Sequence, residues 1–173
     1  LGISKNNFEY FNSKIINIEK ISWQLNKIEI FTDNLKYEKI LNFENDNEQL
    51  FSVIKNYHLY ELLNKSLSKN AYFKKIEFKT KLPDLEKYSL IINTDYFSTL
   101  TKKFFNKKIE KKYNSSACTT IIEHEEVDNK VAVQIFTKKG PLAFLPVSKN
   151  ETSVVYSIHN LKNNNQDNIK NLI

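Results

Sequence analysis

The sequence predicts an α+β fold in which an antiparallel β-sheet domain is combined with an incomplete α/β layer. The chain has 173 residues, of which 40% are hydrophobic and 13% aromatic, and this is enough for a domain with a sizeable core. Apolar residues recur with a helical period within residues 45–67. From residue 113 onward the pattern changes to the alternation that is typical of short strands.

The first third of the chain predicts a short helix, a hairpin and a longer helix. Residues 4–12 begin at Ser4, which is a common helix-capping residue. Ile28 and Ile30 alternate with charged neighbours, as in a half-buried strand, and residues 35–43 are expected to form its hairpin partner. Residues 45–67 carry an apolar stripe on one face and are the strongest helix prediction.

The remainder predicts two α/β strands and then an all-β region. Residues 88–92 are nearly all apolar, as expected for a strand that is covered on both faces, and residues 73–78 form a strand before it. A lysine-rich helix follows. The all-β region is expected to be an antiparallel meander of four strands, at residues 116–126, 130–139, 142–147 and 152–160.

Composition excludes several classes of protein. The single cysteine, Cys118, excludes an internal disulfide and a cysteine-rich zinc site. No apolar run approaches the roughly 20 residues that a membrane-spanning helix needs, and no secretory signal is visible. His124 lies among acidic residues, but on a strand it cannot share a metal site with both neighbours, because adjacent side chains point to opposite faces. The chain opens on Leu1 and lacks methionine, which predicts a piece of a longer protein.

Unaided, these patterns reveal no reaction. The two glycines cannot form a phosphate-binding loop, and no Ser-His-Asp spacing indicates a nucleophile, so no catalytic residue is predicted. Lysines surround two phenylalanines in residues 102–112, and such interleaving can bind nucleic acid or another anionic partner. Because all 26 basic residues of the chain are lysines, a solvated helix face is the preferred interpretation.

A more specific signal lies in the last two predicted hairpins. It consists of Ala132, Gln134 and Phe136 on one strand, then the letters GPLAFLP at 140–146, then SVVYS at 153–157. In this order and spacing the segment resembles the FAD-dependent aromatic-ring monooxygenases, which have the fold of para-hydroxybenzoate hydroxylase. The similarity is to the branch that hydroxylates ubiquinone precursors.

Two weaker similarities precede this segment. Val53, Asn56, Leu59 and Leu63 resemble the positions of the family's helix beside the flavin. Asp95 matches the aspartate of the family's second dinucleotide motif, although Asn93 and Tyr96 replace its glycines, and the family's N-terminal Gly-rich motif is absent. The resemblance therefore describes an internal fragment of such an enzyme.

The resemblance implies an FAD-dependent monooxygenase that uses NAD(P)H and dioxygen to hydroxylate a hydrophobic phenolic quinone precursor. It places the protein in the cytoplasm, with peripheral association with the inner membrane or a biosynthetic complex, and with no nucleic-acid partner. It implies a discontinuous substrate domain at 15–47 and 113–161, a partial FAD-binding domain at 48–112, and the start of a following helix at 162–173.

The same resemblance assigns site residues. Flavin contacts fall to Asn56, Tyr60 and Asp95. The substrate pocket comprises Gln134, Phe136, Gly140, Pro141, Leu142, Phe144 and Pro146, with no metal. Proline removes a backbone donor, so Pro141 and Pro146 are expected to bracket a short strand. The alternative interpretation is a non-catalytic binding module that holds nucleic acid or an anionic partner through residues 102–112.

Overall fold

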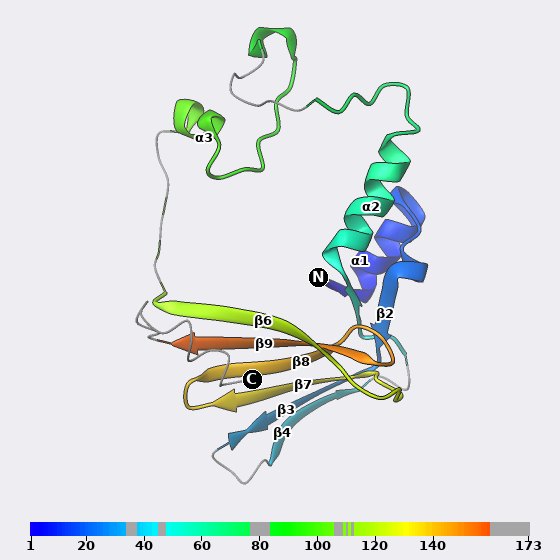
Figure 1. Ribbon diagram of the computed structural model, residues 1–173, viewed down its shortest axis with the longest axis vertical. Helices are drawn as coiled ribbons and strands as arrows, with labels where there is room; N and C mark the ends of the chain where they lie inside the picture. Colours follow the sequence, from blue (N-terminus) through cyan, green and yellow to red (C-terminus); the bar gives the residue numbers. More distant parts are fainter. Residues whose placement is uncertain are drawn as a thin grey trace. The chain divides into compact units, whose positions relative to one another are not determined.

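A computed structural model describes residues 1–33, 38–44, 48–76, 84–105, 109, 111 and 113–159 (Figure 1). The chain divides into two compact units. The larger one is formed by the described parts of Leu1–Lys69 and Asn114–Ile173, and the smaller one by those of Asn70–Tyr113. The finer assignment of residues 15–47 and 113–161 to a substrate domain stays a prediction. The expected helix at 162–173 lies outside the described residues.

The larger unit contains a small antiparallel sheet. Its central strand is β5 (Phe51–Ile54), which pairs with β1 (Gly2–Ser4) on one side and β2 (Ser22–Leu25) on the other. Ser52 and Ile54 are buried on one face, and Val53 is buried on the other. A short strand that is covered on both faces loses its polar alternation, which is why this segment reads as part of a helix.

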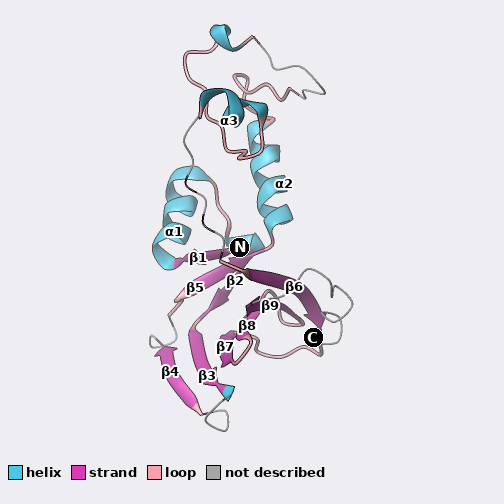
Figure 2. Cartoon of the chain, turned by 90° about the vertical axis from the view of Figure 1, so that its left-hand side faces the viewer, coloured by secondary structure: helices cyan, strands magenta, loops and turns pink. Residues whose placement is uncertain are grey.

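Helices cover one face of this small sheet (Figure 2). The predicted N-terminal helix is confirmed as α1 (Lys5–Tyr10), whose cap Ser4 accepts a hydrogen bond from Asn7 N, and it continues into the π-helix η1 (Phe11–Ile15). The 3-10 helix η2 (Glu19–Ile21) leads into β2. The predicted helix at 45–67 is correct only for α2 (Asn56–Leu67), because β5 occupies its first half.

A first core cluster lies between these helices and the small sheet. Ile18 from the loop before η2 is fully buried, and it packs with Ile54 of β5 and Phe8 of α1. Leu59 and Leu62 of α2 are partly buried against the same cluster. Three strands this short are only marginally stable alone, and on this face of the sheet the helices provide the cover.

The larger unit also contains a mixed six-stranded sheet, in the order β4-β3-β7-β8-β9-β6. All neighbours are antiparallel except β3 and β7, which are parallel. The strands are β3 (Lys27–Thr32), β4 (Lys39–Glu44), β6 (Ser115–Glu123), β7 (Val131–Thr137), β8 (Gly140–Pro146) and β9 (Glu151–His159). The predicted hairpin of β3 and β4 is confirmed, as is its place in the sheet with the C-terminal strands.

The simple meander predicted for the C-terminal strands is wrong in one respect. β7, β8 and β9 follow one another as expected, but β6 pairs with β9 along its whole length and not with β7. The side of β7 that β6 would occupy is taken by β3 in parallel. This exchange moves β6 to one edge of the sheet, opposite β4 (Figure 1).

The coarse α+β class is confirmed, but an FAD-binding α/β layer is not present in the described residues. The described residues 73–76 and 88–92 form no strand. Leu90 is 76% exposed and Ile92 is 78% exposed, so the apolar run lacks the covering layers that a buried parallel strand requires. The smaller unit instead contains the 3-10 helix η4 (Leu85–Lys87) and the short helix α3 (Thr99–Phe104).

A second core cluster joins the two sheets of the larger unit. Leu25 of β2 is fully buried, and it packs with Val53 of β5 and Ala132 of β7. The Trp23 indole supports the same junction, since its Nε1 donates a hydrogen bond of 2.5 Å to the carbonyl oxygen of Asn129. The loops at this end of the large sheet are therefore held by the small sheet.

Candidate functional site

The residues predicted to bind flavin are divided between the two compact units. Asn56 begins α2 and Tyr60, 60% exposed, lies one turn later, whereas Asp95 belongs to the smaller unit. Asp95 Oδ1 accepts a hydrogen bond of 2.9 Å from Phe97 N, and its carbonyl oxygen accepts one of 2.7 Å from Thr101 Oγ1. These contacts are those of a local turn before α3.

The side chains predicted to line one substrate pocket lie on opposite faces of the large sheet. Gln134 pairs with Ala143, while Leu142 pairs with Ile135 and Phe144 pairs with Val133. Directly paired residues share a face, and neighbours along a strand do not. Gln134 and Phe136 therefore lie on one face and Leu142 and Phe144 on the other, so the prediction of a single cavity is wrong.

The remaining pocket residues form the ends of β8. Gly140 and Pro146 are buried and lie on the face of Leu142, whereas Pro141 lies on the face of Gln134. Pro146 ends the seven-residue strand as predicted, whereas Pro141 is the second residue of β8 and pairs with Phe136. The strand limits are therefore Gly140 and Pro146.

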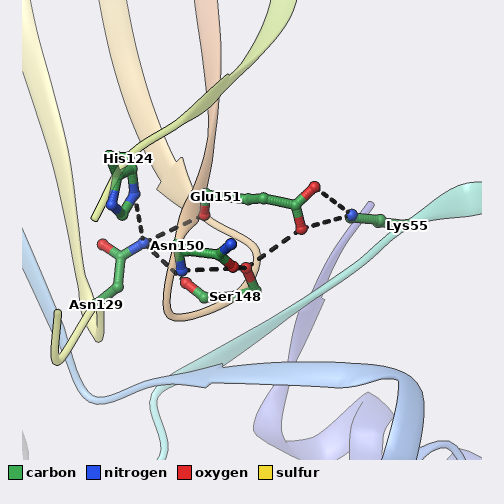
Figure 3. Close-up of polar contacts among 6 residues, drawn as sticks. All are labelled: Lys55, His124, Asn129, Ser148, Asn150 and Glu151. Atoms are coloured by element: carbon green, nitrogen blue, oxygen red, sulfur yellow. Dashed lines mark hydrogen bonds and ion pairs between the residues drawn. The ribbon is translucent and has the colours of Figure 1, made fainter. Parts of the chain in front are cut away.

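A cluster of polar side chains occupies the loops at the start of β9 (Figure 3). Lys55, the residue before α2, contacts both carboxylate oxygens of Glu151, at 2.8 and 2.7 Å. Ser148 Oγ also donates to Glu151 Oε2, at 3.2 Å. The Lys55–Glu151 ion pair ties the helical side of the unit to the large sheet, because the two residues come from segments 96 positions apart.

Asn129 is the centre of this polar cluster. Its side-chain nitrogen lies 2.9 Å from the carbonyl oxygen of Ser148, 3.2 Å from that of Glu151 and 3.0 Å from Thr152 Oγ1. His124 Nε2 is 3.3 Å away and also contacts Thr152 Oγ1. One amide thus links the loop after β6 to the loop before β9, which is a structural role.

The contacts of the polar cluster do not form a nucleophilic site. The single proton of Ser148 Oγ is shared between Asn150 Oδ1 and Glu151 Oε2, whereas the His124 ring contacts Glu125 O, Thr152 and Asn129. A serine nucleophile is activated by a base that accepts its proton, and Glu151 is a weak base because the Lys55 ion pair holds its pKa below the ordinary value. We therefore interpret the polar cluster as a support for the loops.

The Lys55–Glu151 ion pair should make the free energy of unfolding depend on pH. Hydrogen bonding from Lys55 holds the pKa of Glu151 below its ordinary value of 4.5. A lowered folded-state pKa adds stability that is fully present above the unfolded-state pKa and is lost as the pH falls through the folded one. Because the Glu151 side chain is 23% exposed, we expect Glu151→Gln to cost only about 1 kcal/mol at neutral pH.

Urea unfolding at several pH values measures this difference. The gap between wild type and Glu151→Gln should close in acid, below the lowered pKa of Glu151. Glu48→Gln is the matched control, since Glu48 pairs with Lys5 at a more exposed position, and it should lose less. A gap that widened toward acid would contradict the assigned role of the ion pair.

Other kinds of site are not evident in the described residues. They contain no group of three or more histidine, cysteine or acidic side chains that could hold a metal ion. None of the helices formed by these residues is long and apolar enough to span a membrane. A shallow depression of about 330 Å³ is lined by Glu126, Val127, Asp128 and Lys149, and its mixed charges define no ligand.

The most distinctive surface is the edge strand β6. Among the described residues it is the last strand in the order of the large sheet, and its one pairing there is with β9. Its nine residues, SSACTTIIE, contain no lysine and only one charged side chain, Glu123 at the end. Ala117, Thr119 and Ile121 are exposed on one face, and Ile121 is 50% exposed. Such a long uncharged edge is unusual, because proteins normally block edges with charge, proline or bulges.

The opposite edge, β4, has these protective features. Its pairing with β3 is interrupted by an irregularity between Ile30 and Phe31. Lys39 begins the strand and Glu44 ends it, and both take part in ion pairs, Lys39 with Glu29 and Glu44 with Lys27. The contact from Lys39 also holds the pKa of Glu29 below its ordinary value. In the part of the chain that the structure describes, the β6 edge thus lacks the protection that the β4 edge has.

Sequence reasoning missed this edge, although a signal for it exists. The strand itself was expected, but its place at an edge depends on the parallel pairing of β3 with β7. The signal is the absence of lysine over residues 115–123 in a chain with 26 basic residues. The Lys55–Glu151 ion pair and Asn129 had no comparable signal, because their partners are distant in sequence.

The fold and this surface define an α+β domain that is built on a mixed sheet with one open edge. Residues 75–172 match the family described as UPF0606 protein KIAA1549 alpha/beta domain 1. The match covers more than half of the 173 residues, and the chain belongs to this family. No curated protein matches the chain.

The family overturns the functional predictions that rested on the resemblance. The matched family is the KIAA1549 family and not a family of FAD-dependent aromatic hydroxylases, so the enzyme prediction and the description as an oxidoreductase of ubiquinone biosynthesis are wrong. The motif GPLAFLP reflects a short strand of the sheet. FAD, NAD(P)H and a quinone precursor had no other support. The family match gives no support to the alternative prediction of a basic binding module at 102–112. Residues 106–108, 110 and 112 of that segment lie outside the described residues.

Proposed function

We propose that the chain is a non-enzymatic interaction domain whose β6 edge accepts an additional strand from a partner protein. The observation that carries this proposal is the contrast between the two edges of the large sheet. The nine-residue strand β6 has no lysine, whereas β4 is protected by ion pairs and an irregular pairing. In strand addition the backbone of the edge supplies the hydrogen bonds, and the alternating side chains supply the selectivity.

The backbone of β6 has the groups that such a partner needs. Every second residue of an edge strand directs its N–H and C=O away from the sheet, and these groups are satisfied by water until a strand is added. The pairing with β9 is continuous from Ser115 to Glu123, without a bulge that would twist the edge away. The edge therefore offers an unbroken register to a partner over its whole length.

The side chains of β6 indicate the chemistry of the added strand. On one face, Ala117, Thr119 and Ile121 are small, hydroxylated or apolar. On the other face Cys118 and Thr120 are partly buried and lie beside Tyr156 and Val154 of β9. Cross-strand pairs of β-branched and hydroxylated residues stabilise sheets, so the partner segment should be β-branched and uncharged.

Selection of peptides that are displayed as a random library tests this proposal. The wild-type chain, immobilised at low density, should enrich peptides with alternating β-branched residues. Thr119→Lys should abolish their binding, because it places a charge at the middle of the edge while the side chain stays exposed and the fold is kept. Leu41→Lys is the matched control, since Leu41 is 51% exposed on the other edge strand, and it should bind as wild type does.

Two results would overturn the proposal. The first is a library that yields no binding peptide with the correctly folded wild-type chain. The second is a set of peptides whose affinity is unchanged by Thr119→Lys, which would place their site elsewhere. Circular dichroism of both lysine variants verifies that a loss of binding is not a loss of fold.

A further inference from the structure

We infer that the strand added at β6 is β6 of a second copy of the chain, which makes an antiparallel two-fold dimer. This inference rests on the proposed function of the edge. It is carried by a property of the strand sequence: read antiparallel to itself, β6 places a compatible residue opposite every one of its nine positions. Two-fold contacts of this isologous kind are the commonest among homodimers.

The register follows from geometry. A two-fold axis perpendicular to the sheet keeps each face of β6 on the same side as the equivalent face in the second copy. Centring the axis on Thr119 pairs the strand from Ser115 to Glu123 without overhang. The cross-strand pairs are then Thr119 with Thr119, Ala117 with Ile121, Cys118 with Thr120, Ser116 with Ile122, and Ser115 with Glu123, each with its partner from the second copy.

These pairs are complementary in size and charge. Ile121 is 50% exposed and Ile122 is 38% exposed in the single chain, and each would lie against a small residue, Ala117 or Ser116. Opposed threonines can exchange hydrogen bonds across a sheet. The only charged residue, Glu123, meets a Ser115 hydroxyl that can donate to its carboxylate. No like charges are brought together along the strand.

The pairing also ends assembly at two copies. Each dimer uses both β6 edges, and the edges of the large sheet that remain are the two β4 strands. These carry Lys39 and Glu44 and the irregularity opposite Ile30, which disfavour further strand addition. A heterologous contact would leave one β6 edge open and could grow into a fibre, whereas the two-fold contact closes.

Sedimentation equilibrium measures the oligomeric state directly. A single strand pair is a small interface, so we expect a reversible dimer with a dissociation constant on the order of micromolar. Thr119→Lys would set two introduced lysines opposite each other on the axis, and should raise this constant by about tenfold or more. Leu41→Lys adds the same charge at the other edge and should leave the constant unchanged.

Disulfide formation tests the proposed register of the two β6 strands. In a Cys118→Ser background, Thr119→Cys should form an intermolecular disulfide readily on mild oxidation, because the two sulfurs would meet at the axis within the Cα separation that a disulfide requires. Leu41→Cys in the same background is the control and should run as a monomer on a non-reducing gel. Threonine and cysteine are similar in size, so this variant tests the register without adding a charge.

The outcomes separate this inference from the proposed function. A chain that stays monomeric at all concentrations, while displayed peptides still bind β6, overturns the second copy as partner and leaves the proposed function intact. A dimer that is insensitive to Thr119→Lys, or that forms the disulfide at Leu41→Cys and not at Thr119→Cys, also overturns it. Failure of both peptide binding and dimerisation overturns the two together.

Discussion

Gly140→Ala should destabilise the larger unit by about 3 kcal/mol or more. Gly140 has φ of 137°, a conformation that residues with a side chain rarely adopt. A Cβ atom there would lie 2.0 Å from the carbonyl oxygen of Ser157, which is a backbone atom of β9 and cannot move aside alone. The substitution would therefore separate the start of β8, beside the turn from β7, from the C-terminal end of β9, and urea unfolding followed by circular dichroism measures the loss.

Gly2→Ala is the matched control for this prediction. A Cβ atom at Gly2 would also be too close to a neighbour, at 2.4 Å from a ring carbon of Phe51. That neighbour is a side chain which can rotate, and the Gly2 backbone is not in the positive-φ region. We expect a clearly smaller loss than for Gly140→Ala. Equal losses for the two variants would contradict the close approach of β8 and β9.

Leu25→Ala should cost about 2–5 kcal/mol, the range for removing a fully buried leucine side chain. Leu25 is 0% exposed and packs with Val53 and Ala132 at the junction of the two sheets. The substitution leaves a cavity where the small sheet meets the large one. The expected signature in urea unfolding is a lower midpoint, together with a second transition if the two sheets separate.

Leu41→Ala controls for the loss of side-chain area in general. Leu41 is 51% exposed on β4, so its truncation should change the free energy of unfolding by about 0.5 kcal/mol or less. If Leu25→Ala unfolded at the same urea concentration as Leu41→Ala, the second core cluster would not be what holds the sheets together.

Local patterns predicted much of the large sheet. The alternation of Ile28 and Ile30 identified β3, and the same period identified β7 and β9. Proline and glycine set the limits of β8, because one lacks a backbone donor and the other admits a positive φ. These features act over a few residues, so sequence alone contains them.

The features that failed depend on distant parts of the chain. Residues 51–54 were taken into a helix because a strand that is covered on both faces has no alternation to distinguish it. The parallel pairing of β3 with β7 joins segments that are about a hundred residues apart, and it alone decides that β6 is an edge. The Lys55–Glu151 ion pair depends on the same long-range packing.

The resemblance to flavin-dependent hydroxylases failed for a related reason. Its strongest segment is a pair of hairpins with a proline-bounded strand, which the requirements of a β-sheet can produce in unrelated proteins. The two weaker similarities concerned residues of different compact units, Asn56 and Asp95. A strand sequence thus predicted its local structure correctly and its function wrongly.

The most direct test of the β6 edge as the binding surface is amide hydrogen exchange with and without a selected peptide. We predict that the bound peptide slows exchange in Ser115–Glu123 and leaves Lys39–Glu44 unchanged, since added backbone hydrogen bonds protect only the strand that receives them. Protection at β4, or in the described part of the smaller unit, with none at β6, would contradict it.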